Sequence, residues 1–348
     1  MNIGYISDDI RLSTGYGKIG KAVCTHLTKQ GHKVITLGGS LNSEPFQPIK
    51  HEGITIFPVN GYGGNAHIDY LLNVKLDVLL INADPRFFEH VWEMDAEIRK
   101  NCPLIFLHLW DDEPFPIFNV PKYKCCDHII AASKFTYNLL TEGFKDIEGM
   151  PPLTYIPIGT NLDVYRPLLS DKKEEVRKYF LGLINNAFNP KFIVGFIGRF
   201  AVRKRVIDIM DAFTEFAKDK KDVMLLLHTT LQDEAGVIGY VKEQLFKNSP
   251  IVISQMMHQP EDTLNELLNM FCVNINLSSA EGFGMPIIQN ITPRKTPEIS
   301  SHIGLLQRST APGVALRRDD SRGGAIYCRT AALLTQACTA WNVDNPTL

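Results

Sequence analysis

The stretch that most constrains the fold is residues 192–218, because the spacing of its apolar residues changes within a few positions. Residues 192–198, FIVGFIG, form an apolar run that follows Asn-Pro and ends in glycine, as buried parallel strands do. From Val206 onward, apolar residues recur at helical spacing with acidic residues between them, which is typical of an amphipathic helix. The sequence therefore predicts a strand, a short loop and a helix, which is the repeating unit of an α/β protein.

The predicted loop is strongly basic. It contains four cations within seven residues: Arg199, Arg203, Lys204 and Arg205. In open α/β sheets, ligands bind beyond the carboxyl ends of the strands, where the free N–H groups of the next helix attract anions. A single Lys or Arg would be explained as a solvated turn, but four together favour a phosphate site.

Two motifs about eighty residues apart resemble those of one enzyme family. Residues 198–204, GRFAVRK, are similar to the donor-phosphate motif of the retaining GT-B glycosyltransferases of family 4. Residues 277–289, LSSAEGFGMPIIQ, resemble the E-G-F-G-x-P element that opens the paired-glutamate motif of the same family. Because both motifs occur in the family's order, the resemblance is far more specific than a single glycine-rich loop.

The resemblance implies an α/β architecture of the GT-B type, with two Rossmann-like parallel-sheet domains that face each other across a cleft. We expect an N-terminal acceptor-side domain over residues 1–168 and a nucleotide-sugar donor domain over residues 169–289. Residues 155–167, YIPIGTNLDVYRP, resemble the family's strand-to-linker element and mark the boundary. Residues 290–348 do not resemble the family, so we expect the second domain to be incomplete at its C-terminus.

The last segment also differs from the rest in its basic residues. Residues 1–289 contain 21 Lys and 8 Arg, whereas residues 290–348 contain 1 Lys and 6 Arg. A change of reading frame would cause such a shift, so we interpret the segment as a frameshifted or disordered tail that leaves an open edge on the second sheet. The alternative is a diverged functional ending, which a helical pattern over residues 330–341 supports.

In the first half of the chain, apolar runs alternate with helical patterns, which predicts a parallel sheet. The expected strands cover residues 2–7, 54–59, 78–81, 104–108, 128–131 and 154–158, and the expected helices include residues 19–30, 87–100 and 133–142. His108 ends one of these strands, and the resemblance implies that it is the active-site histidine, acting at the sugar through its side chain or its backbone. The alternative is a histidine that packs at a strand end.

A glycine-containing loop follows the first expected strand. Gly15 and Gly17 lie directly before the expected helix, where glycine lets backbone N–H groups approach a ligand closely. The resemblance implies that this loop meets the donor phosphate or the acceptor. A tight turn without a ligand would also account for both glycines.

The second motif supplies the remaining candidates for donor binding. The resemblance places Glu281 beside the transferring sugar, where a carboxylate accepts hydrogen bonds from hydroxyls, and brings the backbone of Gly282, Phe283 and Gly284 close to the donor. Considered alone, Glu281 could instead be a helix N-cap. The family's second glutamate falls at Gln289, whose amide has one acceptor oxygen and one donor group, so we expect weaker binding of the ribose hydroxyls.

The implied reaction is transfer of a sugar from a nucleotide-diphosphate donor to a hydroxyl of a saccharide, lipid or protein, with retention at the anomeric carbon. Arg199 and Lys204 would stabilise the departing diphosphate, so neither a metal nor another cofactor is required. Two alternatives stay open. One is a phosphorylase-like enzyme that uses free phosphate, and the other is a non-catalytic nucleotide-sugar-binding protein, which Gln289 favours.

Composition restricts the number of domains, the kinds of partner and the cellular location that we expect. The 348 residues suit two domains of ordinary size, and a net charge of −2 gives no general attraction to nucleic acid. Seven cysteines without C-x-x-C spacing predict neither a disulfide framework nor a zinc site. We find no signal sequence and no apolar span of membrane length, and we therefore expect a cytoplasmic protein. The first half of the chain has no basic amphipathic stretch, so peripheral membrane contact stays open as an alternative without support from the sequence.

Overall fold

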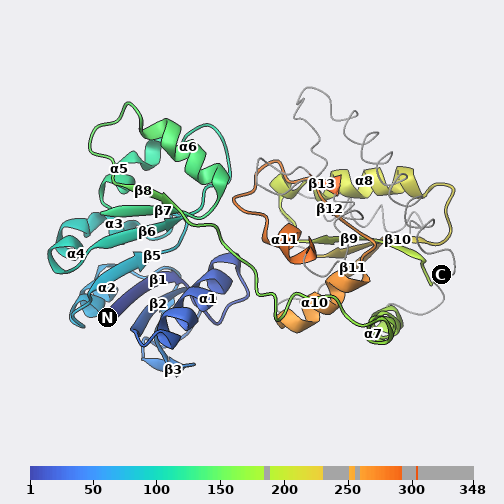
Figure 1. Ribbon diagram of the computed structural model, residues 1–348, viewed down its shortest axis with the longest axis horizontal. Coiled ribbons are helices and arrows are strands. Elements are labelled where there is room, and N and C mark those ends of the chain that lie inside the picture. The colour runs from blue at the N-terminus through green and yellow to red at the C-terminus, as the bar shows by residue number, and fades with distance from the viewer. Residues whose placement is uncertain (184–188, 230–250, 255–258, 292–302, 305–348) are drawn as a thin grey trace. The chain divides into compact units, whose positions relative to one another are not determined.

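The computed structural model describes residues 1–183, 189–229, 251–254, 259–291 and 303–304 (Figure 1). Contacts divide the chain into two compact units, Met1–Gly159 and Thr160–Leu348. Each unit contains one sheet whose strands pair in parallel, apart from one short antiparallel edge strand in the first unit. The predicted α/β class with two parallel sheets is therefore confirmed. No described helix is both long enough and apolar enough to cross a membrane.

The first unit is built on an eight-stranded sheet. In spatial order its strands are β3 (Ile49–His51), β4 (Ile54–Asn60), β2 (Lys33–Leu41), β1 (Asn2–Asp8), β5 (Val78–Ile81), β6 (Leu104–His108), β7 (His128–Ala131) and β8 (Leu153–Tyr155). Its helices are α1 (Gly15–Lys29), α2 (Asn65–Leu72), α3 (Glu89–Glu93), α4 (Asp95–Asn101), η1 (Ile117–Asn119), α5 (Val120–Lys124) and α6 (Lys134–Phe144).

The strand order of the first sheet reverses at β1. The chain runs from β1 to β2 and β4 on one side, and then places β5 and the following strands on the other. Cys24 of α1 packs with Tyr5 on one face, whereas Ile68 of α2 and Ile98 of α4 belong to the larger apolar cluster on the other. The carboxyl ends of β1 and β5 are therefore the point where a doubly wound sheet binds ligands.

The second unit has a five-stranded parallel sheet. In spatial order its strands are β11 (Ile251–Ser254), β10 (Val223–His228), β9 (Phe192–Ile197), β12 (Val273–Asn276) and β13 (Ile303–Gly304). The described helices of this unit are α7 (Ser170–Leu183), η2 (Val202–Lys204), α8 (Val206–Ala217), α10 (Glu261–Met270) and α11 (Met285–Ile291).

Alternate residues of the central strand β9 pack on opposite faces of this sheet. Phe192 and Val194 pack with the buried face of α8, whereas Ile193 packs with the apolar residues of α7 and α10. The apolar run that was predicted to be a buried strand is therefore buried on both sides, which explains why it contains no polar alternation.

Two predicted helices differ from the observed ones. The first begins at Gly15 rather than at residue 19, because the Thr14 hydroxyl caps it by accepting a hydrogen bond from the Gly17 N–H at 3.0 Å. The helix expected over residues 87–100 is two helices, α3 and α4, which are separated at Met94. The sequence also favours a helix over residues 237–246, and these residues lie outside the described part of the chain.

The boundary between the units lies after Gly159, earlier than the predicted residue 168. The Tyr165 hydroxyl donates to Glu261 Oε1 at 3.1 Å, and the Leu168 N–H donates to Asn269 Oδ1 at 3.0 Å. These bonds attach residues 165–168 to α10 of the second unit. By their contacts, residues 165–168 belong to the second unit, because α10 supplies their hydrogen-bond partners.

The segment that was expected to be a foreign tail contributes one described strand. Ile303 and Gly304 of β13 pair in parallel with Ile275 and Asn276 of β12. β12 is therefore not an edge strand over these residues, and the interpretation of residues 290–348 as a foreign tail stays a prediction. Apart from Ile303 and Gly304, residues 292–348 lie outside the described part of the chain. The helical pattern over residues 330–341 is among them.

Candidate functional site

The centre of the second sheet brings the two sequence motifs together. β10 lies on one side of β9 and β12 on the other, so the carboxyl ends of β9 and β12 form the switch point of this sheet. Lys204 lies in η2 after β9, and Glu281 lies in the loop after β12. The Lys204 ammonium forms an ion pair with Glu281 Oε2, although the two residues are 77 positions apart in the sequence.

Arg203 joins the same two loops. Its guanidinium donates to the Ala280 carbonyl at 2.7 Å and lies 3.7 Å from Glu281 Oε2. Its own carbonyl accepts from the Ser279 N–H at 2.8 Å and from the Ser279 hydroxyl at 3.3 Å. In this structure Arg203 therefore holds the loop that carries Glu281.

The other two cations of the basic loop are placed differently. Arg199 is exposed at the surface. Arg205 has a left-handed backbone, with φ of 53°, and its guanidinium pairs with Asp208 in the first turn of α8. Of the four predicted phosphate ligands, Lys204 and Arg203 thus contact the Glu281 loop, whereas Arg205 is engaged with its own helix.

The glycine motif after Glu281 forms the turn into α11. Gly284 has φ of 80° and is buried, and a Cβ added there would lie 3.1 Å from Ile287 Cδ1, so the position favours glycine. Gly282 and Phe283 are partly exposed, whereas Gln289 is buried in α11. The backbone conformation at Gly284 thus accounts for a glycine at this position, and Gln289 lies away from the surface.

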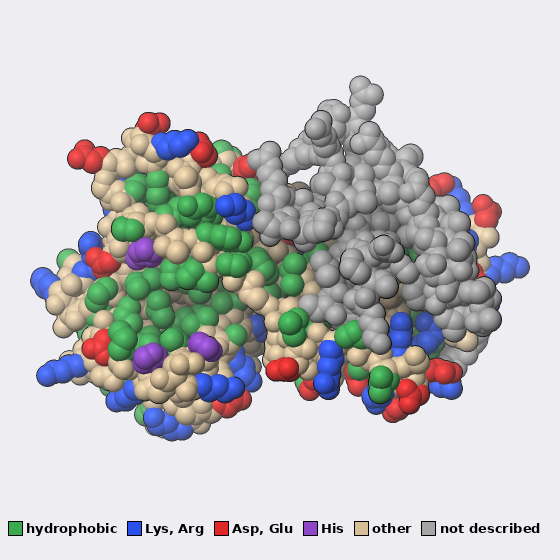
Figure 2. Space-filling model, in the orientation of Figure 1, with side chains coloured by type: hydrophobic (Ala, Val, Ile, Leu, Met, Phe, Trp, Pro, Cys, Tyr) green, Lys and Arg blue, Asp and Glu red, His purple; other side chains and the backbone are tan. Residues whose placement is uncertain are grey.

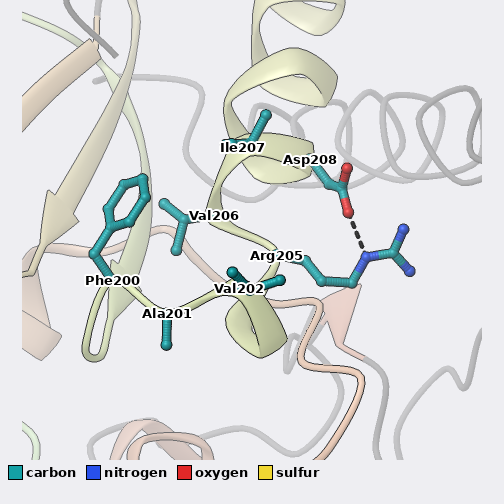
Figure 3. Close-up of a pocket in the computed structure, with 7 residues that line it drawn as sticks. All are labelled: Phe200, Ala201, Val202, Arg205, Val206, Ile207 and Asp208. Carbon is teal, nitrogen blue, oxygen red and sulfur yellow. Dashed lines mark hydrogen bonds and ion pairs between the residues drawn. The ribbon is translucent and has the colours of Figure 1, made fainter. Parts of the chain in front are cut away.

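A cavity of about 270 Å³ lies beside the basic loop (Figure 3). It is lined by Phe200, Ala201, Val202, Arg205, Val206, Ile207 and Asp208. Neither Arg199 nor Lys204 lines it, so this cavity and the Lys204–Glu281 pair are separate features of the loop.

In the first unit, His108 ends β6 as predicted and is completely buried. Its Nε2 lies 3.0 Å from the Tyr123 hydroxyl, and its Nδ1 has no hydrogen-bond partner among the described residues. Burial lowers the pKa of His108 to about 3, against the smaller opposite effect of the Asp84 charge. The imidazole is therefore neutral at pH 7, and a role in contact with a sugar stays a prediction.

The two glycines of the first loop have different surroundings. A Cβ on Gly17 would lie 2.5 Å from the Leu12 carbonyl oxygen and 2.9 Å from that of Asp9, whereas nothing lies within 4 Å of a Cβ on Gly15. Close packing alone accounts for Gly17. Gly15 is exposed at the start of α1, where the predicted contact with a ligand stays open.

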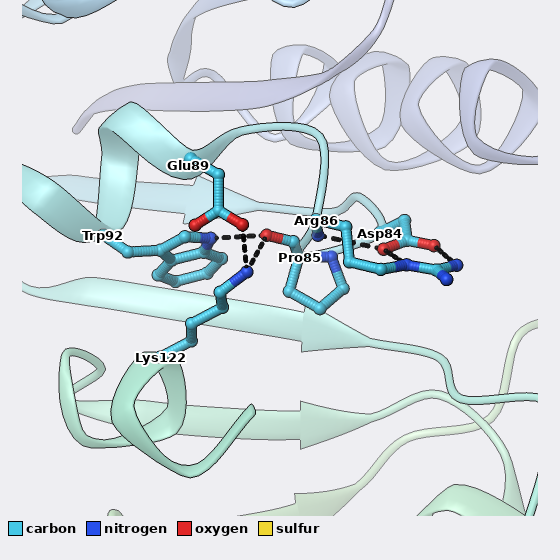
Figure 4. A network of polar contacts seen from close by, with 6 residues as sticks. All are labelled: Asp84, Pro85, Arg86, Glu89, Trp92 and Lys122. Carbon is cyan, nitrogen blue, oxygen red and sulfur yellow. Dashed lines mark hydrogen bonds and ion pairs between the residues drawn. The ribbon is translucent and has the colours of Figure 1, made fainter. Parts of the chain in front are cut away.

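The loop after β5 contains a network of polar contacts that was not predicted from the sequence (Figure 4). Arg86 Nε donates to Asp84 Oδ1 at 2.8 Å, and the Pro85 carbonyl accepts from Trp92 Nε1 at 2.8 Å and from Lys122 Nζ at 2.9 Å. Burial alone would raise the pKa of Asp84, but the hydrogen bonds from Arg86 outweigh it and lower that pKa. A signal was present in the sequence, because Asp-Pro-Arg begins three residues after the end of an expected strand.

Tyr16 of α1 lies among the acidic residues at these strand ends. Burial raises its pKa, and the charges of Asp84, Asp111 and Asp8 raise it further. Asp8 itself accepts hydrogen bonds from the Thr14 hydroxyl at 2.6 Å and the Ser40 hydroxyl at 2.7 Å. The carboxyl edge of the first sheet is thus a polar surface at its switch point.

Hydrophobic side chains gather on one face of the first unit (Figure 2). Phe46 and Tyr70 are exposed, their rings meet edge to face with centroids 5.3 Å apart, and both contact Phe57. This cluster lies over β4 and α2.

Comparison with known proteins gives matches among solved structures alone. No family model and no curated protein matches the chain. A sucrose-phosphate synthase from Thermosynechococcus elongatus superposes with a TM-score of 0.70 at 15% identity, covering 97% of this chain and 90% of its own. An α,α-trehalose-phosphate synthase (UDP-forming) from Burkholderia vietnamiensis gives 0.67 at 10% identity, covering 97% and 91%.

A third similar structure is the pneumococcal O-GlcNAc transferase GtfA in complex with UDP and GlcNAc. It has a TM-score of 0.66 at 12% identity and covers 99% of this chain and 93% of its own. At these identities the likeness concerns the fold. The chain therefore has the GT-B fold, with two Rossmann-like units that each carry a parallel sheet.

Proposed function

We propose that this protein is a retaining glycosyltransferase of family 4 type, which moves a sugar from a nucleotide-diphosphate donor to an acceptor hydroxyl. The observation that carries the proposal is the meeting of Lys204 and Glu281 at the switch point of the second sheet. These residues come from the two motifs of the resemblance, and the fold is one that UDP-forming and UDP-bound transferases share.

In the proposed reaction, Lys204 and Arg199 bind the donor diphosphate and stabilise the negative charge that develops as it leaves. Glu281 accepts hydrogen bonds from hydroxyls of the transferring sugar. Without a donor, the ammonium and the carboxylate satisfy each other. Arg203 lies 3.7 Å from Glu281 Oε2, so the carboxylate keeps a cation nearby when Lys204 turns to a phosphate.

The remaining roles follow the same assignment. His108 of the first unit acts at the transferring sugar, and Gly15 leaves space for a ligand at the start of α1. The cations of the basic loop supply the positive charge at the diphosphate, so the proposed transfer requires no metal. The acceptor is a saccharide, lipid or protein hydroxyl.

Thermal-shift measurements with UDP, GDP, ADP and CDP sugars, and with inorganic phosphate, test which ligand class the protein binds. A ligand that binds only the folded state raises the melting temperature by mass action. We expect a nucleotide sugar to do so, followed by release of the nucleoside diphosphate when an acceptor is added. Stabilisation by inorganic phosphate alone would instead support the phosphorylase-like alternative.

A Lys204→Met variant tests the residue assignment. Loss of one charge-assisted bond should weaken nucleotide-sugar binding, measured by calorimetry, by about 1.5–3 kcal/mol. Lys218→Met is the matched control, because Lys218 is an exposed lysine of the same unit that pairs with Glu215. Unchanged affinity in Lys204→Met, or equal loss in the control, contradicts the phosphate assignment.

A nucleotide-sugar-binding protein without turnover is the second candidate. Gln289 favours it, because the residue at the position of the second glutamate is an amide that is buried in α11. Binding of a nucleotide sugar without release of nucleoside diphosphate, over a panel of sugar, lipid and peptide acceptors, would favour this candidate over the transferase.

A further inference from the structure

One hydrogen bond holds the side chain of His108. Its Nε2 lies 3.0 Å from the Tyr123 hydroxyl of α5, and both residues are completely buried. The two rings meet edge to face with centroids 5.4 Å apart, and Phe106 packs against the imidazole with centroids 4.4 Å apart. The imidazole is thus enclosed by two aromatic rings and oriented by one hydroxyl.

The backbone at this strand end is held as well. The Ala132 N–H donates to the His108 carbonyl at 2.9 Å, and the Asn82 side-chain amide donates to the Leu107 carbonyl at 2.8 Å. Asn82 is itself completely buried and joins the end of β5 to β6. Within the described part of the chain, Nδ1 is then the side-chain atom of His108 that lacks a hydrogen-bond partner.

We propose that Tyr123 is a positioning residue for His108. Its O–H donates to Nε2, which places the ring proton on Nδ1 and holds the buried ring, and with it the His108 backbone at the end of β6, in one orientation. The proposal rests on the proposed function, because it deepens the role that His108 has there. No bond is made or broken in this step, and the imidazole stays neutral.

The direction of the hydrogen bond follows from the chemistry of the two groups. A neutral imidazole has one donor nitrogen and one acceptor nitrogen, and the hydrogen bond made by one nitrogen decides which of them carries the proton. A buried phenol hydrogen without an acceptor is costly, and Nε2 is an acceptor within reach. Without such a partner a neutral histidine prefers the proton on Nε2, so Tyr123 reverses the ordinary preference.

NMR of protein labelled with ¹⁵N in the histidine rings tests the tautomer directly. We expect the His108 proton on Nδ1 in the parent chain and on Nε2 in Tyr123→Phe, which keeps the ring and removes the hydroxyl. Tyr5→Phe is the matched control, because it removes another buried hydroxyl, one that lies 3.2 Å from Asn82 Oδ1. This control should keep the proton on Nδ1.

A proton on Nε2 in the parent chain would overturn the proposal, and this spectrum needs no variant to fold. An unchanged tautomer in Tyr123→Phe would overturn it as well. So would a switch to Nε2 of equal extent in Tyr5→Phe, because the tautomer would then depend on general packing.

Kinetics give the second readout. With a nucleotide sugar that the parent chain turns over, Tyr123→Phe should lower kcat roughly tenfold, equal to about 1.4 kcal/mol, and leave the donor KM unchanged. Equal kcat in the variant and the parent contradicts the positioning role. If no donor is turned over, the proposed function fails, but the NMR result still decides the tautomer, so the two failures are distinguishable.

Discussion

The buried imidazole of His108 makes stability depend on pH. Burial lowers its pKa to about 3 in the folded chain, whereas an unfolded histidine has a pKa of about 6.5. Between these values the unfolded chain binds a proton that the folded chain does not, so the free energy of unfolding falls as the pH drops. From this residue the loss is at most about 1.4 kcal/mol per pH unit.

We therefore expect His108→Phe to lose less stability than the parent between about pH 7 and pH 5, as measured by urea unfolding. His26→Gln is the control, because His26 is exposed on α1 and should keep the parent's pH dependence. Equal losses in the parent and in His108→Phe would show that His108 is protonated in the folded state.

The backbone of Arg205 is strained, because its φ of 53° lies in the left-handed region that favours glycine. Arg205→Gly removes this strain, of about 1–2 kcal/mol, and loses an ion pair with Asp208 that contributes about 0.3–1 kcal/mol. Glycine also loses about 0.5–1 kcal/mol more backbone entropy on folding, so we expect Arg205→Gly to be close to the parent, and more stable than Arg205→Ala, in denaturant unfolding. Arg205→Ala keeps the strain and loses the pair, so it should be less stable than the parent. The opposite order would contradict a strained Arg205.

Two glycines at the start of α1 allow close packing and ligand binding to be tested separately. Gly17→Ala places a Cβ 2.5 Å from the Leu12 carbonyl oxygen, and because backbone cannot yield easily, we expect a loss of about 1–3 kcal/mol in the free energy of unfolding. Gly15→Ala meets open space and should leave stability unchanged. If Gly15→Ala also leaves nucleotide-sugar and acceptor affinity unchanged, the predicted ligand contact at Gly15 is wrong.

At the scale of the whole molecule, the two units have separate apolar cores. Proteins with such cores commonly depart from two-state unfolding, and we expect two calorimetric transitions. Asn269→Ala should lower only the transition of the second unit, because Asn269 accepts from the Leu168 N–H and donates to the Arg166 carbonyl at 3.1 Å. A single transition, or a shift of both, would show that the units unfold together.

Most strands and helices of the fold could be predicted from local patterns in the sequence. The run at residues 192–198 became β9, the periodic residues after it became α8, and His108 ends β6 as expected. These predictions succeed because the spacing of apolar residues shows which face of each segment is buried. That spacing differs between helices and strands and can be read over a few residues. Boundaries were less accurate, because the cap at Thr14 and the break at Met94 depend on single side chains and backbone angles.

The sequence by itself determined the α/β class, the two parallel sheets, and the motifs that contain Lys204 and Glu281. Only the tertiary structure decided that these two side chains pair, that Arg203 holds the Glu281 loop, that His108 is enclosed beside Tyr123, and that Ile303 lies against β12. Each of these contacts joins segments that are distant along the chain. Strand order decides which segments meet at a sheet's carboxyl edge, and the local spacing of residues does not specify that order.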